Sequence, residues 1–297
     1  MRHSGMSVSA LCRLFGVSRQ GYYQYEQFVE SRSFTYQLII SEVHELRKLQ
    51  PRVGGRKMFV MLQTLFMQHQ IKIGRDIFFD LLSEHHLLVR MRKRRYITTY
   101  SKHPFKKYPN LIKDIVATAP HQVWVGDITY IPMQNNFAYL SLLTDAYSRK
   151  IVGWYLSADL CAYGCVQSLS MALKQKPQVA KVIHHSDRGI QYCSGEYVGV
   201  LCNEGVVSSM TDAADPYQNA IAERVNGILK TELLLEEYTT IDSARAAITK
   251  AVMIYNYHRL HSSCDLLTPA QAHQQEGVLK KHWKNYYKRK EAVITLD

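Results

Sequence analysis

The spacing of apolar residues along the chain changes near residue 120 from a helical to a strand-like period. Upstream, apolar residues recur at steps of three and four positions, which is typical of amphipathic helices. Downstream, short runs of β-branched and aromatic residues lie between turn residues, which is typical of strands. The pattern therefore predicts an N-terminal helical region followed by a mixed α/β sheet with helices on its faces.

The N-terminal pattern starts with two short helices that flank Gly16. Ser18 is suited to cap the second helix, and a helix, a Gly-containing turn and a helix form the outline of a helix-turn-helix. Further along, Pro51 and Gly74 separate longer helical segments. A DNA-docking region and a plain helical bundle both fit this periodicity. The expected helices span residues 7–15, 18–25, 34–49, 55–68 and 75–84.

The downstream pattern predicts three strands in a meander and then alternating helices and strands. β-Branched and aromatic residues dominate the strand segments, and Pro132 ends the first of them. Strands are expected at residues 123–131, 137–144, 150–156, 181–185 and 206–209. Helices are expected at residues 163–174, 194–204, 218–235 and 241–259.

Length and composition narrow the class of protein. A chain of 297 residues suggests about two domains. Its hydrophobic content of 46% excludes a wholly disordered chain. No apolar run approaches the ~18 residues that a membrane helix needs. Arg13 interrupts the segment where a signal peptide would have its apolar core. We therefore expect a protein of the cytoplasm with no membrane partner.

The chain has 37 Lys and Arg residues and 25 Asp and Glu residues, which gives a formal net charge of +12. This excess of positive charge favours nucleic acid as the partner. Between Glu84 and Asp114 nine basic residues occur with no acidic one, and Pro104 and Pro109 disfavour a continuous helix there. Phosphate contact explains this run better than a solvated surface does. The expected organisation is a helix-turn-helix-like segment at 1–30, a helical DNA-binding region at 31–89, a basic linker at 90–117, a catalytic core at 118–275 and a basic tail at 276–297.

Two aspartates lie at positions where a sheet can build a site. Asp127 falls inside the first expected strand, and a period of two places it on one face with Val125 and Ile131. A carboxylate on such an apolar face must be paired, protonated or bound to metal. Asp187 follows directly on the strand that ends at His185. Open α/β sheets bind ligands just past the ends of their strands, although a turn-forming aspartate also fits that position.

The third acid is Glu223 on the expected helix 218–235. At ~100° per residue, Asn219, Asn226 and Lys230 share its polar stripe, which we expect to face outward while the aliphatic side packs on the sheet. Three carboxylates from three elements can hold two Mg²⁺ ions, which prefer oxygen ligands and serve phosphoryl transfer. Two other acids, Asp145 and Asp212, fall in turn-like contexts and are expected to be structural.

These acids lie in a specific set of motifs. The first two are Trp124-x-x-Asp127-Ile-Thr-Tyr and His185-Ser-Asp187-Arg-Gly-Ile-Gln-Tyr192. The third is Gln218-Asn-Ala-Ile-Ala-Glu223-Arg-Val-Asn-Gly-Ile-Leu-Lys230, in which 35 residues separate Asp187 from Glu223. The combination resembles the OrfB-type subunit of bacterial insertion-sequence DDE transposases of the "IS-three" family, which have a retroviral-integrase-like core.

The resemblance implies an RNase H-like mixed sheet with flanking helices and catalytic, metal-binding roles for Asp127, Asp187 and Glu223. It implies Mg²⁺ or Mn²⁺, two ions per active site, and cleavage that frees a 3′-OH, which then attacks another phosphodiester without a covalent enzyme intermediate. The implied partners are double-stranded DNA (element ends and target), further copies in a homo-oligomer, and an upstream OrfA-type subunit or fusion. The implied location is the bacterial cytoplasm, at the nucleoid.

Candidate DNA contacts come from the basic linker and from the surroundings of the acids. They are Arg92, Lys93, Arg94, Arg95, Lys106, Lys107, Arg188, Asn219, Asn226 and Lys230. Two other functions fit the same charge pattern: a DNA-binding regulator or accessory subunit that does not cut, and a nuclease that cuts without joining.

Overall fold

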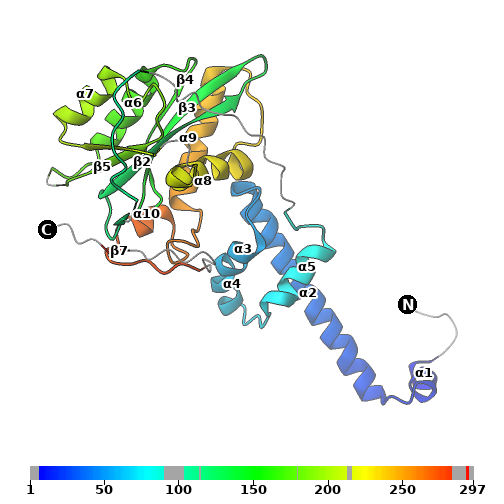
Figure 1. Cartoon of the computed structure of the whole chain (residues 1–297). Coiled ribbons are helices and arrows are strands. Elements are labelled where there is room, and N and C mark those ends of the chain that lie inside the picture. Colours follow the sequence, from blue (N-terminus) through cyan, green and yellow to red (C-terminus); the bar gives the residue numbers. More distant parts are fainter. Residues whose placement is uncertain are drawn as a thin grey trace. The chain divides into compact units, whose positions relative to one another are not determined.

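The chain consists of two units, Met1–Arg90 and Met91–Asp297 (Figure 1). The computed structural model describes residues 7–89, 104–113, 115–178, 180–212, 216–282 and 292–293. No helix among these residues is both long and apolar enough to span a membrane.

The first unit is helical, as the apolar spacing predicts. Ser7 and Ser18 cap its first two helices with their side-chain oxygens, and Gly16 takes a φ of 65° in the turn between them. The second helix does not end near Tyr25 but continues to Leu49, so the prediction of two separate helices there is wrong. The segment 55–68 is interrupted at Leu62. The helices are α1 (Val8–Leu14), α2 (Arg19–Leu49), α3 (Gly55–Met61), α4 (Gln63–Gln68) and α5 (Arg75–Glu84).

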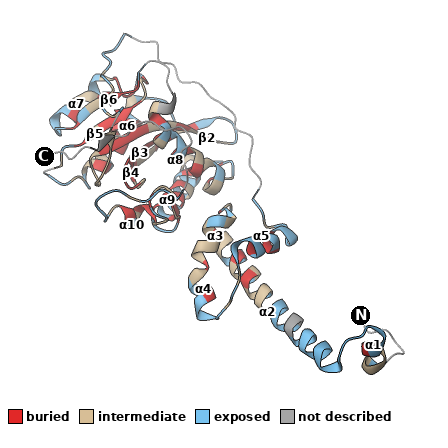
Figure 2. Cartoon of the chain, turned by 60° about the horizontal axis from the view of Figure 1, so that its bottom comes forward, coloured by how far each residue is buried: buried red, intermediate tan, exposed pale blue. Residues whose placement is uncertain are grey.

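The core of this unit is formed by the C-terminal half of α2 and by the helices that follow. Ile39 and Val43 of α2 are fully buried and belong to one apolar cluster with Met58 and Phe78. The ring of Phe78 packs at 6.3 Å from that of Phe66. None of the described side chains in the N-terminal half of α2 belongs to this cluster, and Figure 2 shows much of that half in the colour of exposed residues.

A five-stranded sheet forms the second unit, with the strand order β4-β3-β2-β5-β6. The first three strands along the chain form an antiparallel meander, whereas β5 and β6 extend it in parallel from β2. This arrangement confirms the predicted RNase H-like mixed sheet. All five expected strands are present: β2 (Val123–Pro132), β3 (Phe137–Asp145), β4 (Ile151–Ser157), β5 (Ile183–Ser186) and β6 (Val207–Met210). A short parallel pair, β1 (Ile115–Val116) with β7 (Ala292–Val293), was not expected.

Helices cover both faces of the sheet and bury two apolar layers. On one face, Trp124 and Leu143 pack with Leu169 of α6 and Leu201 of α7. Close approach of α6 requires Gly153 on β4, since a Cβ there would overlap the carbonyl of Ser168. The helices of this face are α6 (Ala162–Leu173) and α7 (Gly195–Asn203).

The other face carries α8 (Ala220–Ile228) and α9 (Ile241–Tyr257). Ile131 of β2 packs there with Val225 and Ile248. The expected helix 218–235 is shorter than predicted: a 3₁₀ turn, Pro216–Asn219, precedes α8, and a π-helical turn, Leu229–Leu233, follows it. Because Asp127 shares its strand face with Ile131, its side chain points toward α8. A last short helix is α10 (Pro269–Ala272).

Candidate active site

Asp127 and Asp187 are brought together by the register of two parallel strands. Val125 of β2 pairs with His185 of β5, so the positions two residues further along, Asp127 and Asp187, lie side by side. Asp187 comes directly after the end of β5, where the chain leaves the sheet. The two carboxylates therefore meet at the carboxyl end of the parallel part of the sheet, as the sequence predicts.

The environment of Asp127 opposes its negative charge. Burial, the neighbouring Asp187 and, more weakly, Glu223 raise the pKa of this carboxyl, which is about 7. Two hydrogen bonds act in the opposite direction: the Ile128 backbone N–H donates to Oδ1 at 2.9 Å, and Asn226 Nδ2 donates to Oδ2 at 2.7 Å. The carboxylate is thus held in a fixed orientation at a position where it needs positive charge nearby.

Gly189 fixes the orientation of Asp187. Its backbone N–H donates to Asp187 Oδ1 at 2.9 Å. A Cβ at this glycine would lie 2.9 Å from the same oxygen, closer than nonbonded carbon and oxygen atoms tolerate. Any other residue would therefore displace the carboxylate.

The polar stripe of α8 faces β2, the strand that carries Asp127. The expectation that this stripe faces outward is therefore wrong for Asn219 and Asn226. Asn219 and Asn226 are each 4% exposed, and Asn219 Nδ2 donates to the Gly126 carbonyl at 3.0 Å. Glu223, between them on the helix surface, is exposed. It is close enough to Asp127 to influence its pKa. The helix thus uses its amides to bind β2 and presents its carboxylate at the edge of the site.

Lys230 lies in the π-helical turn after α8 and is half-buried. Burial lowers the pKa of its ammonium group, and the Asp127 carboxylate raises it. The same turn is fastened to the end of α9, where Arg259 donates two hydrogen bonds to Glu232, of 2.7 and 2.8 Å. Arg259 is only 2% exposed. A bidentate ion pair of this kind restricts the geometry of the turn that holds Lys230.

The three acids fit a hard divalent cation. They supply carboxylate oxygens, which Mg²⁺ and Mn²⁺ prefer, and they concentrate negative charge. The Oδ1 atoms of Asn219 and Asn226 are buried and, within the described residues, have no hydrogen-bond partner. Such orphaned oxygens suit the water shell of a bound ion. Among the described residues, no three acidic, His or Cys side chains already converge on one point. A three-carboxylate site would require the Glu223 side chain to turn toward the aspartates.

The two histidines that precede Asp187 are structural. His184 Nε2 lies 3.0 Å from the hydroxyl of Tyr197, and His185 Nδ1 lies 2.9 Å from Ser209 Oγ. Burial lowers the pKa of His184 to about 3 and that of His185 to about 4. Both rings are neutral at physiological pH and buried, so neither can serve as a base for a solvent molecule.

The rival acids are structural, as predicted. Asp145 is fully buried and accepts hydrogen bonds from the backbone N–H of His121 at 2.7 Å and from the N–H and hydroxyl of Ser148 at 2.8 Å each. Asp212 is exposed and accepts a 3.2 Å hydrogen bond from Gln218 Nε2. Asp187 is a main cause of the raised pKa of Asp127, whereas Asp145 and Asp212 are not among its causes.

The remaining candidate DNA contacts differ in exposure. Lys106 and Lys107 are exposed, with the Lys106 ammonium 5.3 Å from the centre of the Tyr108 ring. Arg188 is half-buried and donates from Nε to the Thr211 carbonyl at 2.7 Å. The other linker candidates, Arg92, Lys93, Arg94 and Arg95, lie outside the described residues.

Sequence reasoning did not find the roles of Gly126 and Asn226. A Cβ at Gly126 would lie 2.9 Å from His184 Nε2, so this glycine lets the neighbouring strand pack beside Asp127. A glycine inside an apolar strand was the available signal. For Asn226, the signal was its spacing of three from Glu223, which places both on the same side of the helix.

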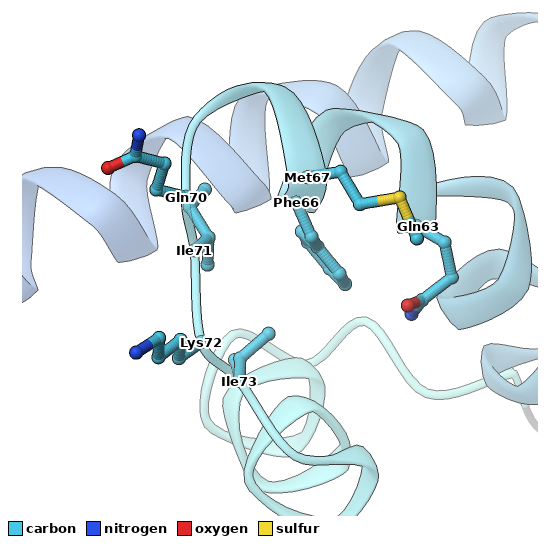
Figure 3. Close-up of a pocket in the computed structure, with 7 residues that line it drawn as sticks. All are labelled: Gln63, Phe66, Met67, Gln70, Ile71, Lys72 and Ile73. Atoms are coloured by element: carbon cyan, nitrogen blue, oxygen red, sulfur yellow. The ribbon is translucent and has the colours of Figure 1, made fainter.

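A pocket with a cavity volume of about 530 Å³ lies in the helical unit (Figure 3). Its lining residues fall between Gln63 and Ile73, distant in sequence from Asp127, Asp187 and Glu223. Phe66, Ile71 and Ile73 give it an apolar wall, and Gln63 and Lys72 lie at its edge. It contains none of the predicted site residues, so the acidic site is not this pocket.

Comparisons with known proteins agree with the fold. Two family models, both described as integrase core domain, match residues 117–216 and 204–269. An insertion element IS600 uncharacterized 31 kDa protein of Shigella sonnei is 34% identical over 265 residues, which cover 88% of this chain and 96% of that protein. Transposase InsF for insertion sequence IS3A, from Escherichia coli strain K12, is 29% identical over 272 residues, 89% of this chain and 93% of that protein.

Among solved structures, the HTLV-2 integrase catalytic core domain in complex with magnesium, in its dimeric form, is 20% identical and has a TM-score of 0.41. The match covers 52% of this chain and 98% of the integrase core domain.

The strand order and the matching models define the second unit as an integrase core, the catalytic domain of polynucleotidyl transferases. The chain belongs to the family of insertion-sequence DDE transposases, as the sequence motifs predict. Its general function is DNA transposition.

Proposed function

We propose that this transposase cuts DNA at the ends of an insertion sequence and joins the freed 3′-OH to another strand, with Asp127, Asp187 and Glu223 as the catalytic carboxylates. The observation that carries the proposal is the meeting of Asp127 and Asp187 across two parallel strands, with Glu223 presented by the helix that covers them. A buried carboxyl whose pKa is raised by neighbouring carboxylates, as that of Asp127 is, is typical of functional sites.

The three carboxylates would hold Mg²⁺ or Mn²⁺, two ions per site, and the ions would supply the positive charge that lets an acidic site bind and polarise a phosphodiester. Asn226 holds Asp127 in place, and Gly189 does the same for Asp187. Lys230 is placed to neutralise charge beside Asp127 and to bind a DNA phosphate. In the first step water attacks the phosphodiester at the element end and a 3′-OH leaves. In the second step that hydroxyl attacks another phosphodiester, whose own 3′-oxygen leaves.

The test is incubation of the full chain with labelled element-end DNA and Mg²⁺. Joined products are the expected result. DNA that is cut but never joined would identify a nuclease, and binding without cutting would identify a regulator or accessory subunit. The same assay with an upstream OrfA-type subunit added shows whether the chain requires such a partner. The proposed place of action is the nucleoid in the bacterial cytoplasm, where the DNA substrate lies.

The DNA path would follow the basic linker and tail. Lys106 and Lys107 are exposed and suited to phosphate contact, as are Arg92, Lys93, Arg94 and Arg95 by their sequence. Arg188 can reach DNA only with the guanidinium nitrogens that do not bind Thr211. Each phosphate contact adds about −0.9 to the slope of log affinity against log salt. Replacing Lys106 and Lys107 by Gln should flatten that slope by about one unit per lost contact. An unchanged slope would show that these lysines do not touch the DNA backbone.

A further inference from the structure

Six large apolar side chains at the N-terminal end of the helical unit are exposed to solvent. They come from the end of α1, the turn after it and the start of α2, and we call them the arm surface: Leu14 (69% exposed), Phe15 (73%), Val17 (51%), Tyr22 (37%), Tyr23 (42%) and Tyr25 (67%). Every side chain from Arg13 to Gln27 is exposed, and Figure 2 shows this half of α2 in the colour of exposed residues. Exposed apolar groups at this density are typical of protein interfaces.

The half of α2 that carries the arm surface lacks, among the described residues, the core contacts that stabilise the other half. Its first two turns contain Gly21 and three tyrosines, which have lower helix propensity than Ala, Leu or Glu. Helical segments shorter than about 12–15 residues are marginal in water without tertiary contacts. The other half of α2 has such contacts, since Ile39 and Val43 are fully buried. The exposed half obtains little from α1, in which Cys12 is the one buried residue of the described helix.

Two tyrosines of the arm surface share a heptad register with the residues that pack the rest of α2. Tyr22 and Tyr25 are followed, at steps of 11, 3 and 4, by Tyr36, Ile39 and Val43, and the exposed Arg32 lies between the two groups. This spacing corresponds to the a and d positions of a heptad pattern. The C-terminal part of this pattern packs inside the unit, whereas the N-terminal part has no partner among the described residues.

We propose that the arm surface pairs two copies of this chain, with the two α2 helices antiparallel. In this register Tyr22 packs against the partner subunit's Tyr25, and the two-fold axis repeats the contact. Arg19 and Glu26 are one heptad apart and both occupy e positions. Antiparallel helices face e to e, so Arg19 lies opposite the partner subunit's Glu26, twice per pair. A parallel pair would place like charges at the same height and would form no such ion pair.

The placing of the charges favours this occupant over DNA. The exposed charged residues around the arm surface carry both signs, Arg13, Arg19 and Arg32 with Glu26 and Glu30, and the two acids beside the tyrosines suit a self-complementary protein contact better than a polyanion. The hydroxyl of Tyr22 lies 3.5 Å from Glu26 Oε1, so the acid is held beside the apolar seam where the partner's arginine would arrive. The inference does not depend on the proposed chemistry, because association can be measured without catalysis.

The first test is sedimentation equilibrium of the full chain without DNA, over the micromolar concentration range. The wild-type chain should associate to dimers, and Tyr22→Ser with Tyr25→Ser should weaken the dimer by about tenfold or more, since buried tyrosines are frequent interface hot spots. Tyr163→Ser is the matched control, because Tyr163 is half-exposed on α6 and should not change association. A wild-type chain that stays monomeric, or a double variant that associates normally, would overturn the proposal.

Charge reversal tests the antiparallel register. Arg19→Glu and Glu26→Arg should each weaken the dimer, and the double variant should restore it, since the pair is reversed but kept. A double variant weaker than either single variant would contradict the register. If the variants weaken DNA binding and leave association unchanged, the arm surface is a DNA contact and the proposal is wrong.

Discussion

Asn226 on α8 donates a 2.7 Å hydrogen bond from Nδ2 to Oδ2 of Asp127 on β2. The bond joins the helix of the third acid to the strand of the first, and it is one of two hydrogen bonds that favour the charged form of Asp127. Burial and Asp187 act against that form. The ionisation of Asp127, and with it cation binding, therefore depends on a neutral amide.

Replacing Asn226 by Ala should shift the pH dependence of DNA joining. Hydrogen bonds to a charged group contribute about 1.5–3 kcal/mol, and one pKa unit corresponds to about 1.4 kcal/mol. Loss of the amide raises the pKa of Asp127, so the acidic limb of the pH–rate profile at subsaturating Mg²⁺ should move up by about one unit. Asn256→Ala is the matched control: that buried amide binds the backbone of Ile151 on β4, two strands away from Asp127, and its loss should reduce stability without moving the limb. Equal profiles for the two variants would contradict the role of Asn226.

Replacing Asp127 by Asn should stabilise the metal-free protein at alkaline pH. The folded-state pKa of Asp127, about 7, lies above its usual value of 3.8, so the folded state binds this proton more tightly than the unfolded state does. The wild type therefore loses stability as pH rises from about 4 to about 7. In EDTA, the variant should be more stable by about 2–4 kcal/mol at pH 8, a gain that vanishes near pH 4. Urea unfolding at both pH values measures it, and a gain independent of pH would refute the explanation.

Gly189→Ala should damage the site without unfolding the protein. The new Cβ would lie 2.9 Å from Asp187 Oδ1 and push the carboxylate out of its position. A displacement of this kind costs about 10²-fold in rate. Gly195→Ala, in the first turn of α7, meets no atom within 4 Å and should keep full joining activity. Single-turnover rates and melting temperatures of both variants separate the two effects; normal joining by Gly189→Ala would show that Asp187 does not need this support.

The positions of the two aspartates could be predicted from the sequence because strands impose a simple geometry. The period of two predicted that Asp127 lies on the same strand face as Val125 and Ile131. The end of the predicted strand at His185 put Asp187 at the edge of the sheet. The structure has both residues at these positions. The residue types also predicted that the first three strands form a meander, but the parallel pairing of β5 with β2 came from the structure.

Helices were less predictable, because periodicity defines a stripe but not what the stripe faces. Asn219 and Asn226 share their stripe with Glu223, and the sequence alone could not show that the amides bind β2. The chain has no glycine or proline between Tyr25 and Phe34 that would end α2, and this signal for one long helix was not used in predicting two. The burial of Arg259 against Glu232 depends on a π-helical turn that has no recognisable sequence signal.

The most direct test of the account is the single-turnover rate at which Asp187→Asn joins labelled element-end DNA in Mg²⁺, measured beside Glu196→Gln. Glu196 is an exposed acid on α7 and serves as the control for loss of one negative charge. Removing one group that stabilises transition-state charge costs about 10²–10³-fold in rate. The account predicts a loss of at least this size for Asp187→Asn and a normal rate for Glu196→Gln. Joining by Asp187→Asn at the wild-type rate would contradict the assignment of the acidic site.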